Sequence, residues 1–158
     1  MAMEIERKFL LASEDWREQA HSSQPIIQGY LADNERCSVR VRLAGEQANL
    51  NLKGVTVGAS RSEFEYPLSL ADGRFMLKHY CADRVVEKVR HLVDFAGKRW
   101  EIDEFSGRNL GLLVAEFELD SEHEHFLRPP WLGEEVTGEP RYYNLMLADA
   151  PYQSWPHV

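Results

Sequence analysis

The sequence predicts a mainly antiparallel β protein of the α+β type, in which about eight strands close into a barrel with helices packed outside. Two observations lead to this prediction. Stretches in which apolar and charged residues alternate follow one another along most of the chain, as in strands with one face against an apolar layer. A sheet of about eight such strands has two unpaired edges unless it closes on itself.

Each predicted strand is bounded by a turn or by a residue that limits pairing. Gly45 and Gly97 lie in short turns between alternating stretches, which indicates two hairpins. Pro25 limits where pairing can begin in the second strand, because proline has no N–H to donate. The expected strands are 4–11, 24–32, 38–43, 48–53, 62–66, 85–95, 99–103 and 112–119, with a further fragment over 133–138.

Helices are expected between the strands and near the C-terminus. Ser13 can cap a first short helix, and Ser121 followed by Glu124 forms a capping-box pattern. Pro140 suits the first residue of a closing helix. The expected helices are 14–20, 70–80, 122–127 and 141–148.

The 158 residues carry a formal net charge of −8, and no apolar run is long enough to span a bilayer. An acidic chain is expected to bind neither nucleic acid nor an anionic membrane unless its cations are gathered in one place. Cys37 and Cys81 lack the spacing of a metal site or a disulfide framework, and the N-terminus lacks a signal-peptide pattern. We therefore expect a single cytoplasmic domain over residues 1–158, with a loosely held tail over about 150–158.

Same-sign charges flank a single apolar residue in one predicted strand after another. Seven such triplets occur, against roughly three expected from the composition. One triplet alone is most simply a solvated strand face, but together they indicate that successive strands share a charged face. The pairs are Glu4 and Glu6, Arg40 and Arg42, Glu63 and Glu65, Lys88 and Arg90, Glu101 and Asp103, Glu116 and Glu118, and Glu118 and Asp120.

Two ways of closing the barrel remain open at this point. In one, apolar side chains fill the middle and the charges face water. In the other, the charged faces line a tunnel, and the apolar residues between them pack outward under the helices. The outward residues would then be Ile5, Val41, Phe64, Val89, Ile102 and Phe117.

The charge count favours the tunnel if a ligand is present. Eight carboxylates and six cations on the charged faces give a formal charge of −2, which two divalent cations would change to +2. That value suits a triphosphate of roughly −4 to −5. Oxygen ligands favour Mg²⁺ or Mn²⁺, and in-line phosphoryl transfer needs metal and cationic side chains on the phosphates. The carboxylates counted are Glu4, Glu6, Glu63, Glu65, Glu101, Asp103, Glu116 and Glu118; the cations are Lys8, Arg40, Arg42, Lys53, Lys88 and Arg90.

The ordered set of motifs resembles the CYTH, or triphosphate tunnel metalloenzyme, superfamily over nearly the whole chain. Glu4, Glu6 and Lys8 match its N-terminal Glu-x-Glu-x-Lys signature, and the arginine, lysine and acidic motifs follow in the family's order. Residues 28–31, 135–137 and 141–144 resemble segments of the short bacterial members. The resemblance implies a charged tunnel that hydrolyses inorganic triphosphate with Mg²⁺ or Mn²⁺.

The resemblance also implies roles for the residues that match the motifs. A tyrosine–lysine pair, here Tyr30 and Lys53, is the expected proton acceptor, because an ammonium beside a phenol lowers the pKa of the phenol. Glu63 and Glu65 are equally well metal ligands or counterions of the arginines. We expect Glu4, Glu6, Glu116 and Glu118 to hold the activating metal with Glu101 and Asp103 at a second metal, and Lys8, Arg40, Arg42, Lys53, Lys88 and Arg90 to bind the phosphates.

Other functions remain open from the sequence. A class IV adenylyl cyclase would use the same tunnel with the ribose 3′-hydroxyl as nucleophile, and a thiamine or nucleoside triphosphatase would differ only in its substrate. A barrel that binds polyphosphate without catalysis is the alternative outside enzymes. A homodimer is left open as well.

Overall fold

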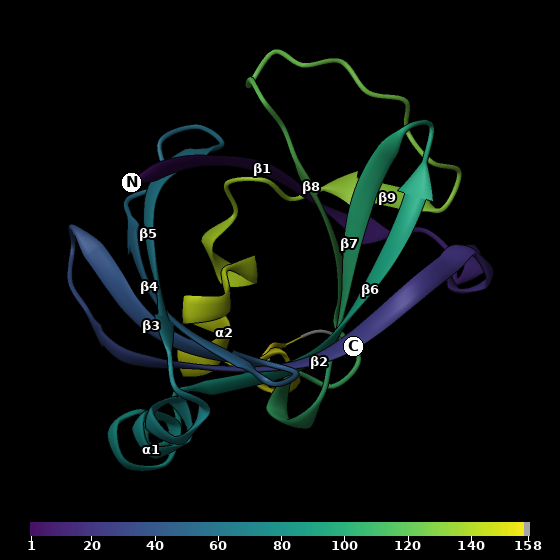
Figure 1. The fold of residues 1–158 in the computed structure, drawn as a ribbon. Coiled ribbons are helices and arrows are strands. Elements are labelled where there is room, and N and C mark those ends of the chain that lie inside the picture. Colours follow the sequence, from purple (N-terminus) through teal and green to yellow (C-terminus); the bar gives the residue numbers. More distant parts are fainter. Residues whose placement is uncertain (157–158) are drawn as a thin grey trace.

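The computed structural model describes residues 1–156 and contains a closed antiparallel barrel (Figure 1). Around the barrel the strands follow the order β1-β5-β4-β3-β2-β6-β7-β8, and β8 pairs back to β1. This confirms the predicted eight-stranded closure. The barrel strands are β1 (Ala2–Leu11), β2 (Ala20–Asp33), β3 (Cys37–Ala44), β4 (Gln47–Gly54), β5 (Ser60–Leu68), β6 (Val85–Phe95), β7 (Lys98–Phe105) and β8 (Leu113–Glu118); a ninth strand, β9 (Leu132–Glu135), pairs with β1.

Strand β1 closes the barrel by using both of its edges. Residues 2–5 pair with β5, and residues 6–9 pair with β8 on the opposite edge. On the edge of β1 that pairs first with β5 and then with β9, residues 6–8 lie between these two partners. Loop atoms satisfy their backbone groups there. The N–H of Glu6 donates to the carbonyl of Ala59 at 3.2 Å, and the N–H of Lys8 donates to Oγ1 of Thr137 at 2.8 Å. The stretch that carries the acidic signature is therefore fixed by segments from outside the barrel.

Strand β2 extends four residues further toward the N-terminus than predicted, and Pro25 explains how its pairing is divided. Residues 20–29 pair with β6, whereas pairing with β3 begins only at Ile26, directly after Pro25. Proline has no N–H to donate to a neighbouring strand. Pro25 thus limits pairing with β3, as expected, without ending the strand.

Apolar side chains form two buried clusters, one outside the barrel and one inside it at one end. The outer cluster surrounds Trp100 and includes Ile102 and Phe117, covered by Trp16 and by the chain between β8 and β9. The inner cluster includes Val86 and Val114, which lie on the same strand faces as Lys88 and Glu116, and Leu147 of the C-terminal segment packs against them.

The outer face of β5 has no such cover. Phe64 and Tyr66 are 39% and 51% exposed. The prediction that Phe64 packs under a helix is therefore wrong, because helix α1 lies over β2, β3 and β4 and stops short of β5.

Three of the four predicted helices have a counterpart, and one is wrong. The expected helix 14–20 is a short 3-10 helix, η1 (Asp15–Gln19); 70–80 is α1 (Leu70–Tyr80); and 141–148 divides into η3 (Pro140–Tyr142) and α2 (Asn144–Asp149). Two further 3-10 helices are η2 (Gly107–Asn109) and η4 (Tyr152–Ser154). None of the helices within residues 1–156 is long and apolar enough to cross a membrane.

Residues 122–127 form a turn and an extended segment instead of the expected helix. Ser121 and Glu124 do make local bonds, since Oγ of Ser121 accepts from the N–H of His123 and Oε1 of Glu124 accepts from the N–H of Asp120. The chain then extends so that Phe126 packs against Trp100. Tertiary packing of one aromatic ring outweighs a capping pattern worth about 1 kcal/mol.

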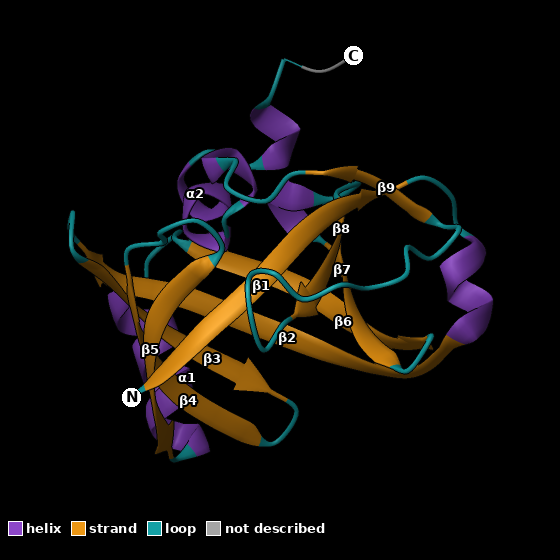
Figure 2. Ribbon diagram, turned by 90° about the horizontal axis from the view of Figure 1, so that it is seen from above, coloured by secondary structure: helices purple, strands orange, loops and turns teal. Residues whose placement is uncertain are grey.

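The C-terminal segment lies across one end of the barrel. Figure 1 shows α2 within the ring of strands, and Figure 2, turned by 90°, shows it beyond the strand ends on the same side as β9. The tail expected to be loosely held begins near residue 150, and Trp155 contacts Tyr142 at a ring-centroid distance of 5.4 Å. Residues 157–158 of that expected tail lie outside the described residues.

We predict that Gly73→Ala destabilises the protein, opposite in sign to the usual effect of alanine in a helix. Gly73 lets α1 lie close to β3 and β4, because a Cβ there would be 2.8 Å from both Cβ of Ala48 and Cδ2 of Leu43. Urea unfolding should show a loss of about 1–3 kcal/mol from overpacking. The double variant with Ala48→Gly should recover part of it; unchanged stability of Gly73→Ala would contradict this close approach.

Candidate active site

The barrel encloses a cavity of about 290 Å³ lined by charged side chains from seven of its eight strands. Six carboxylates and seven cations line it, giving a formal charge of +1. The charged faces therefore point inward, and the apolar-filled alternative is excluded. The carboxylates are Glu4, Glu6, Glu63, Glu101, Glu116 and Glu118; the cations are Lys8, Arg40, Arg42, Lys53, Arg61, Lys88 and Arg90.

Carboxylates gather on one wall of the cavity, which β1 and β8 form and which we call the acidic wall. Glu4 and Glu6 come from β1, and Glu116 and Glu118 come from β8, where Glu6 is paired in register with Glu118. Burial raises the pKa of Glu116, but the charges of Lys8 and Arg90 hold it well below its usual value. Lys8 Nζ lies 3.3 Å from Glu116.

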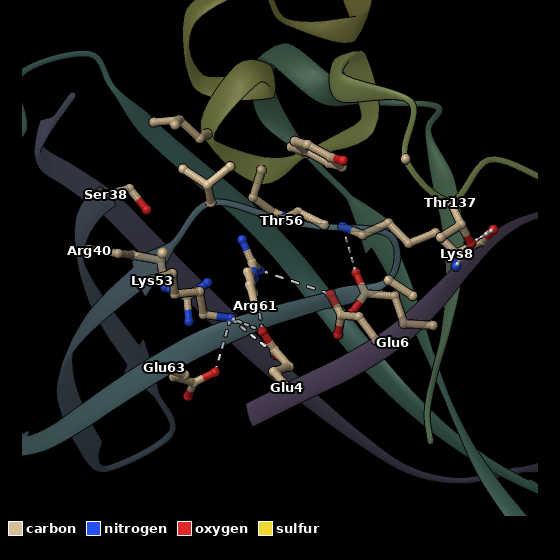
Figure 3. A pocket seen from close by; sticks show the side chains of 18 of the residues that line it. Glu4, Glu6, Lys8, Ser38, Arg40, Lys53, Thr56, Arg61, Glu63 and Thr137 are labelled. Atoms are coloured by element: carbon tan, nitrogen blue, oxygen red, sulfur yellow. Dashed lines mark hydrogen bonds and ion pairs between the residues drawn. The ribbon is translucent and has the colours of Figure 1, made fainter. Parts of the chain in front are cut away.

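Glu6 is a carboxylate of the acidic wall that neighbouring cations neutralise only in part. Burial and the neighbouring charge of Glu116 raise the pKa of Glu6 to about 7. Its cationic contact is Nη2 of Arg61, at 4.0 Å (Figure 3). Burial and the charges of Glu4 and Glu63 also raise the pKa of Glu118. The acidic wall therefore has more negative charge than the side chains around it neutralise.

Cations gather on the opposite side, where Arg40 and Arg42 of β3 lie with Lys53 of β4; we call this the basic wall. Burial and the charges of Arg40 and Arg90 lower the pKa of Arg42 to about 10. Burial and the charges of Arg40 and Arg61 also lower the pKa of Lys53. Buried Nε of Arg40 has no hydrogen-bond partner among residues 1–156. A buried, unpaired guanidinium donor and mutually repelling cations make an anion site.

A cluster at the β4–β5 side of the cavity joins the two walls. Lys53 Nζ donates to Glu4 at 3.0 and 3.1 Å and lies 3.3 Å from Glu63. Nε of Arg61 donates to Glu4 at 2.9 Å. Burial works against ionisation of Glu4, but Lys53 and Arg61 lower its pKa to about 2. Glu63 is thus paired with Lys53 in this arrangement (Figure 3).

Asp103 and Glu65 do not line the cavity. Asp103 is fully buried and accepts from Lys88 Nζ at 2.7 Å and from Nε of Arg90 at 2.8 Å. Glu65 is exposed and accepts from Asn51 Nδ2 at 3.1 Å. Glu101, the partner of Asp103 in its triplet, does line the cavity and pairs with Arg90 at 2.9 Å.

Tyr30 lines the cavity and is 4% exposed. The ammonium of its expected partner, Lys53, bonds to the carboxylates of Glu4 and Glu63. Arg61 is a cation whose charge interacts with Tyr30. Arg61 was not among the residues predicted for the site, although it precedes Glu63 by two residues and so belongs to the same inward face of β5.

Polar residues of the C-terminal segment also reach the cavity, and the charge pattern did not reveal them. Thr137, Tyr143 and Asn144 line it, with Lys8 Nζ 5.6 Å from the ring centroid of Tyr143. Within residues 1–156, no three His, Cys, Asp or Glu side chains are already grouped as a metal would require. Four of the cavity carboxylates are instead paired with lysines and arginines: Glu4, Glu63, Glu101 and Glu116.

We expect Asp103→Asn to lower the free energy of unfolding by about 3–5 kcal/mol, because it leaves Lys88 and Arg90 without their buried anion. Urea unfolding is the measurement. The control is Glu104→Gln on the same strand, whose carboxylate is 38% exposed and pairs with Arg17 at 2.8 Å. That change should cost less than about 1 kcal/mol. Equal losses in both variants would contradict the special status of Asp103.

Three comparisons relate this charged barrel to known proteins. An inorganic triphosphatase from Acetivibrio thermocellus is 39% identical over 155 residues, which cover 98% of this chain and 99% of that protein. An inorganic triphosphatase from Nitrosomonas europaea is 37% identical over 151 residues, covering 92% and 96%. The crystal structure of an inorganic triphosphatase superposes with a TM-score of 0.69 at 32% identity, covering 99% of both chains. The CYTH domain matches residues 2–143, and the chain belongs to the CYTH domain family.

Proposed function

We propose that this chain hydrolyses inorganic triphosphate to phosphate and diphosphate inside the barrel, with a divalent cation. The observation that carries the proposal is the division of the cavity into an acidic and a basic wall, each with charge that its neighbours do not neutralise. A metal ion on one wall and a phosphate chain on the other would neutralise both. The name shared by the two relatives supports the same activity.

The acidic wall fits a hard divalent cation. Its donors are carboxylate oxygens, which Mg²⁺ and Mn²⁺ prefer, and Glu6 lacks a close cation of its own. Bound there, Mg²⁺ or Mn²⁺ would polarise a phosphoryl oxygen. We assign Glu4, Glu6, Glu116 and Glu118 to this metal and Glu101 to a second one. We assign Asp103 and Glu63 the role of counterions, because Asp103 does not line the cavity and Glu63, which lies on β5 away from the acidic wall, pairs with Lys53.

The charge and size of the cavity favour an inorganic triphosphate. Two divalent cations added to the lining charge of +1 give +5, close to the roughly −5 of a fully ionised triphosphate. A cavity of about 290 Å³ lies at the lower limit of ordinary small-molecule sites. A nucleoside triphosphate would need further room for its base and ribose.

In the reaction, a water attacks the terminal phosphorus, the P–O–P bond breaks, and the water gives its proton to a base. Tyr30 is the proposed acceptor, and Lys53 and Arg61 are cations that line the same cavity. Arginine forks hold phosphate oxygens in two-point contacts. We assign this grip to Lys8, Arg40, Arg42, Lys88 and Arg90.

The experiment that tests the function is product analysis over a panel of tripolyphosphate, ATP and thiamine triphosphate with Mg²⁺ or Mn²⁺. Phosphate and diphosphate from tripolyphosphate should be the main products. Cyclic AMP from ATP as the main product would favour the adenylyl cyclase instead. Tight binding of tripolyphosphate with no turnover in the presence of either metal would favour a barrel that binds polyphosphate without catalysis.

Compartment and assembly are proposals of the same kind. Cys37 and Cys81 are both free, as expected of a protein in the reducing cytoplasm. The bare outer face of β5, with Phe64 and Tyr66 exposed, is the surface on which we would look for a homodimer by sedimentation.

Glu6→Gln should abolish turnover while stabilising the metal-free protein at alkaline pH. The raised pKa of Glu6 means that its contribution to stability is present below pH 4.5 and is lost as pH rises through about 7. Urea unfolding in chelator should therefore show a gain of about 1–3 kcal/mol at pH 8 and little gain at pH 4.5. Glu134→Gln, on the exposed face of β9, is the control. Equal gains at both pH values would contradict this account.

We also predict that tripolyphosphate binds weakly when divalent cations are removed. Without them, its charge faces the unneutralised carboxylates of the acidic wall, notably Glu6 and Glu118. Calorimetry in chelator should show a Kd raised by at least about tenfold, or 1.4 kcal/mol. Undiminished affinity in chelator would remove the metal from the binding step.

A further inference from the structure

A chain of hydrogen bonds begins at Arg42 of the basic wall, at the end of the barrel that the C-terminal segment covers. Nε of Arg42 donates to Oε1 of Gln28 at 3.1 Å. Nε2 of Gln28 then donates to Oδ1 of Asn144 at 2.7 Å. Nζ of Lys88 donates to the same oxygen of Asn144 at 3.1 Å. One amide oxygen of the C-terminal segment thus joins cations from β3 and β6.

The chain continues from Lys88 to a third cation. Lys88 Nζ also donates to Asp103, which in turn accepts from Arg90 through both carboxylate oxygens at 2.8 and 3.0 Å. Gln28 and Asp103 are fully buried. One hydrogen-bond network therefore connects the three phosphate-binding candidates at this end, Arg42, Lys88 and Arg90. Asn144 is the member of this network that does not come from a barrel strand.

Helix α2 holds Asn144 rigidly in place. Leu147 and Ala148 are buried in the cluster that contains Val86 and Val114. Nε of Arg84 donates to Oδ1 of Asp149 at 2.8 Å. Asn144 is the first residue of α2, so the packing of α2 against this cluster fixes the amide that reaches the cavity.

The position of Asn144 determines how the cations meet a phosphate. The ammonium of Lys88 has three N–H donors, of which Asp103 and Asn144 accept two, leaving one for a phosphate oxygen. Gln28 must donate through Nε2 to Asn144, which turns its Oε1 toward Arg42. With Nε held there, the terminal nitrogens of Arg42 remain for two-point contact with phosphate.

We propose that Asn144 is a positioning residue of the phosphate site, acting through Lys88 and, by way of Gln28, through Arg42. The inference rests on the proposed function, since it concerns the grip on the same triphosphate. It gives the C-terminal helix a part in substrate binding beyond covering the end of the barrel.

The test compares Asn144→Leu with Asn109→Leu in steady-state kinetics on tripolyphosphate. Both variants remove a side-chain amide of the same size, but the Oδ1 of Asn109 accepts from the N–H of Tyr152 outside the cavity. Asn144→Leu should raise KM about tenfold with a change in kcat below about threefold, as expected for a lost hydrogen bond to charged groups. Asn109→Leu should leave KM unchanged, although it also lowers Tm.

Gln28→Leu and the double variant with Asn144→Leu complete the test. Because both residues act through one chain, the double variant should raise KM by less than the product of the single effects. Asn144→Ala replaces Asn144→Leu if circular dichroism shows that the latter does not fold. A fall in Tm with wild-type KM in the Asn144 variants would overturn the proposal, as would fully multiplicative effects.

Assays of hydrolysis and binding with the wild-type protein distinguish failure of this inference from failure of the proposed function. If it hydrolyses tripolyphosphate and the Asn144 variants keep its KM, the inference alone fails. If it binds tripolyphosphate without hydrolysis, calorimetric Kd values replace KM in the same comparison. If it neither hydrolyses nor binds tripolyphosphate, the proposed function fails and the role of Asn144 fails with it.

Discussion

Neutralisation of buried charge is the constraint on which this structure depends. Each ionised group inside a protein costs several kcal/mol unless a partner of opposite sign lies beside it, and thirteen such groups surround the cavity. The barrel meets the cost with specific pairs, such as Lys88 with Asp103 at 2.7 Å. Because the charged faces point into the barrel, the apolar faces between them point outward and must be buried under segments outside the barrel. Trp100, for example, is covered by Trp16 and Trp131.

Pairing is incomplete at the places where chemistry is expected. Glu6 on the acidic wall and Nε of Arg40 on the basic wall both lack close partners among the described residues. A fold selected for stability alone would pair or replace such groups. Their separation on opposite walls favours simultaneous binding of a cation and an anion over binding of either one alone.

The sequence was sufficient to predict the barrel, because a two-residue period relates each charge to a face of its strand. The period left open whether the charged faces point inward, and the charge count and the family resemblance favoured that direction. The sequence could not show how deeply each charged side chain is buried. Asp103 shares a face with Glu101 but is fully buried, and only the structure shows that it is paired with Lys88. The two-residue period places Arg61 on the same face of β5 as Glu63. It was not predicted as a site residue because it belongs to no same-sign triplet. The helix expected over 122–127 failed because long-range packing of Phe126 determines that segment.

The residues that complete the site come from outside the repeating pattern, and this follows from how a barrel closes. The strands supply walls, but the ends and the unpaired edge of β1 must be completed by loops. The carbonyl of Ala59 and Oγ1 of Thr137 bond the backbone of Glu6 and Lys8, while Asn144 reaches the cations at the covered end. Glu122, between β8 and β9, fixes the β4–β5 loop through the N–H of Ala59 at 2.9 Å. Segments without charge periodicity thus hold the charged residues in position, and the precision of the site depends on them as much as on the barrel.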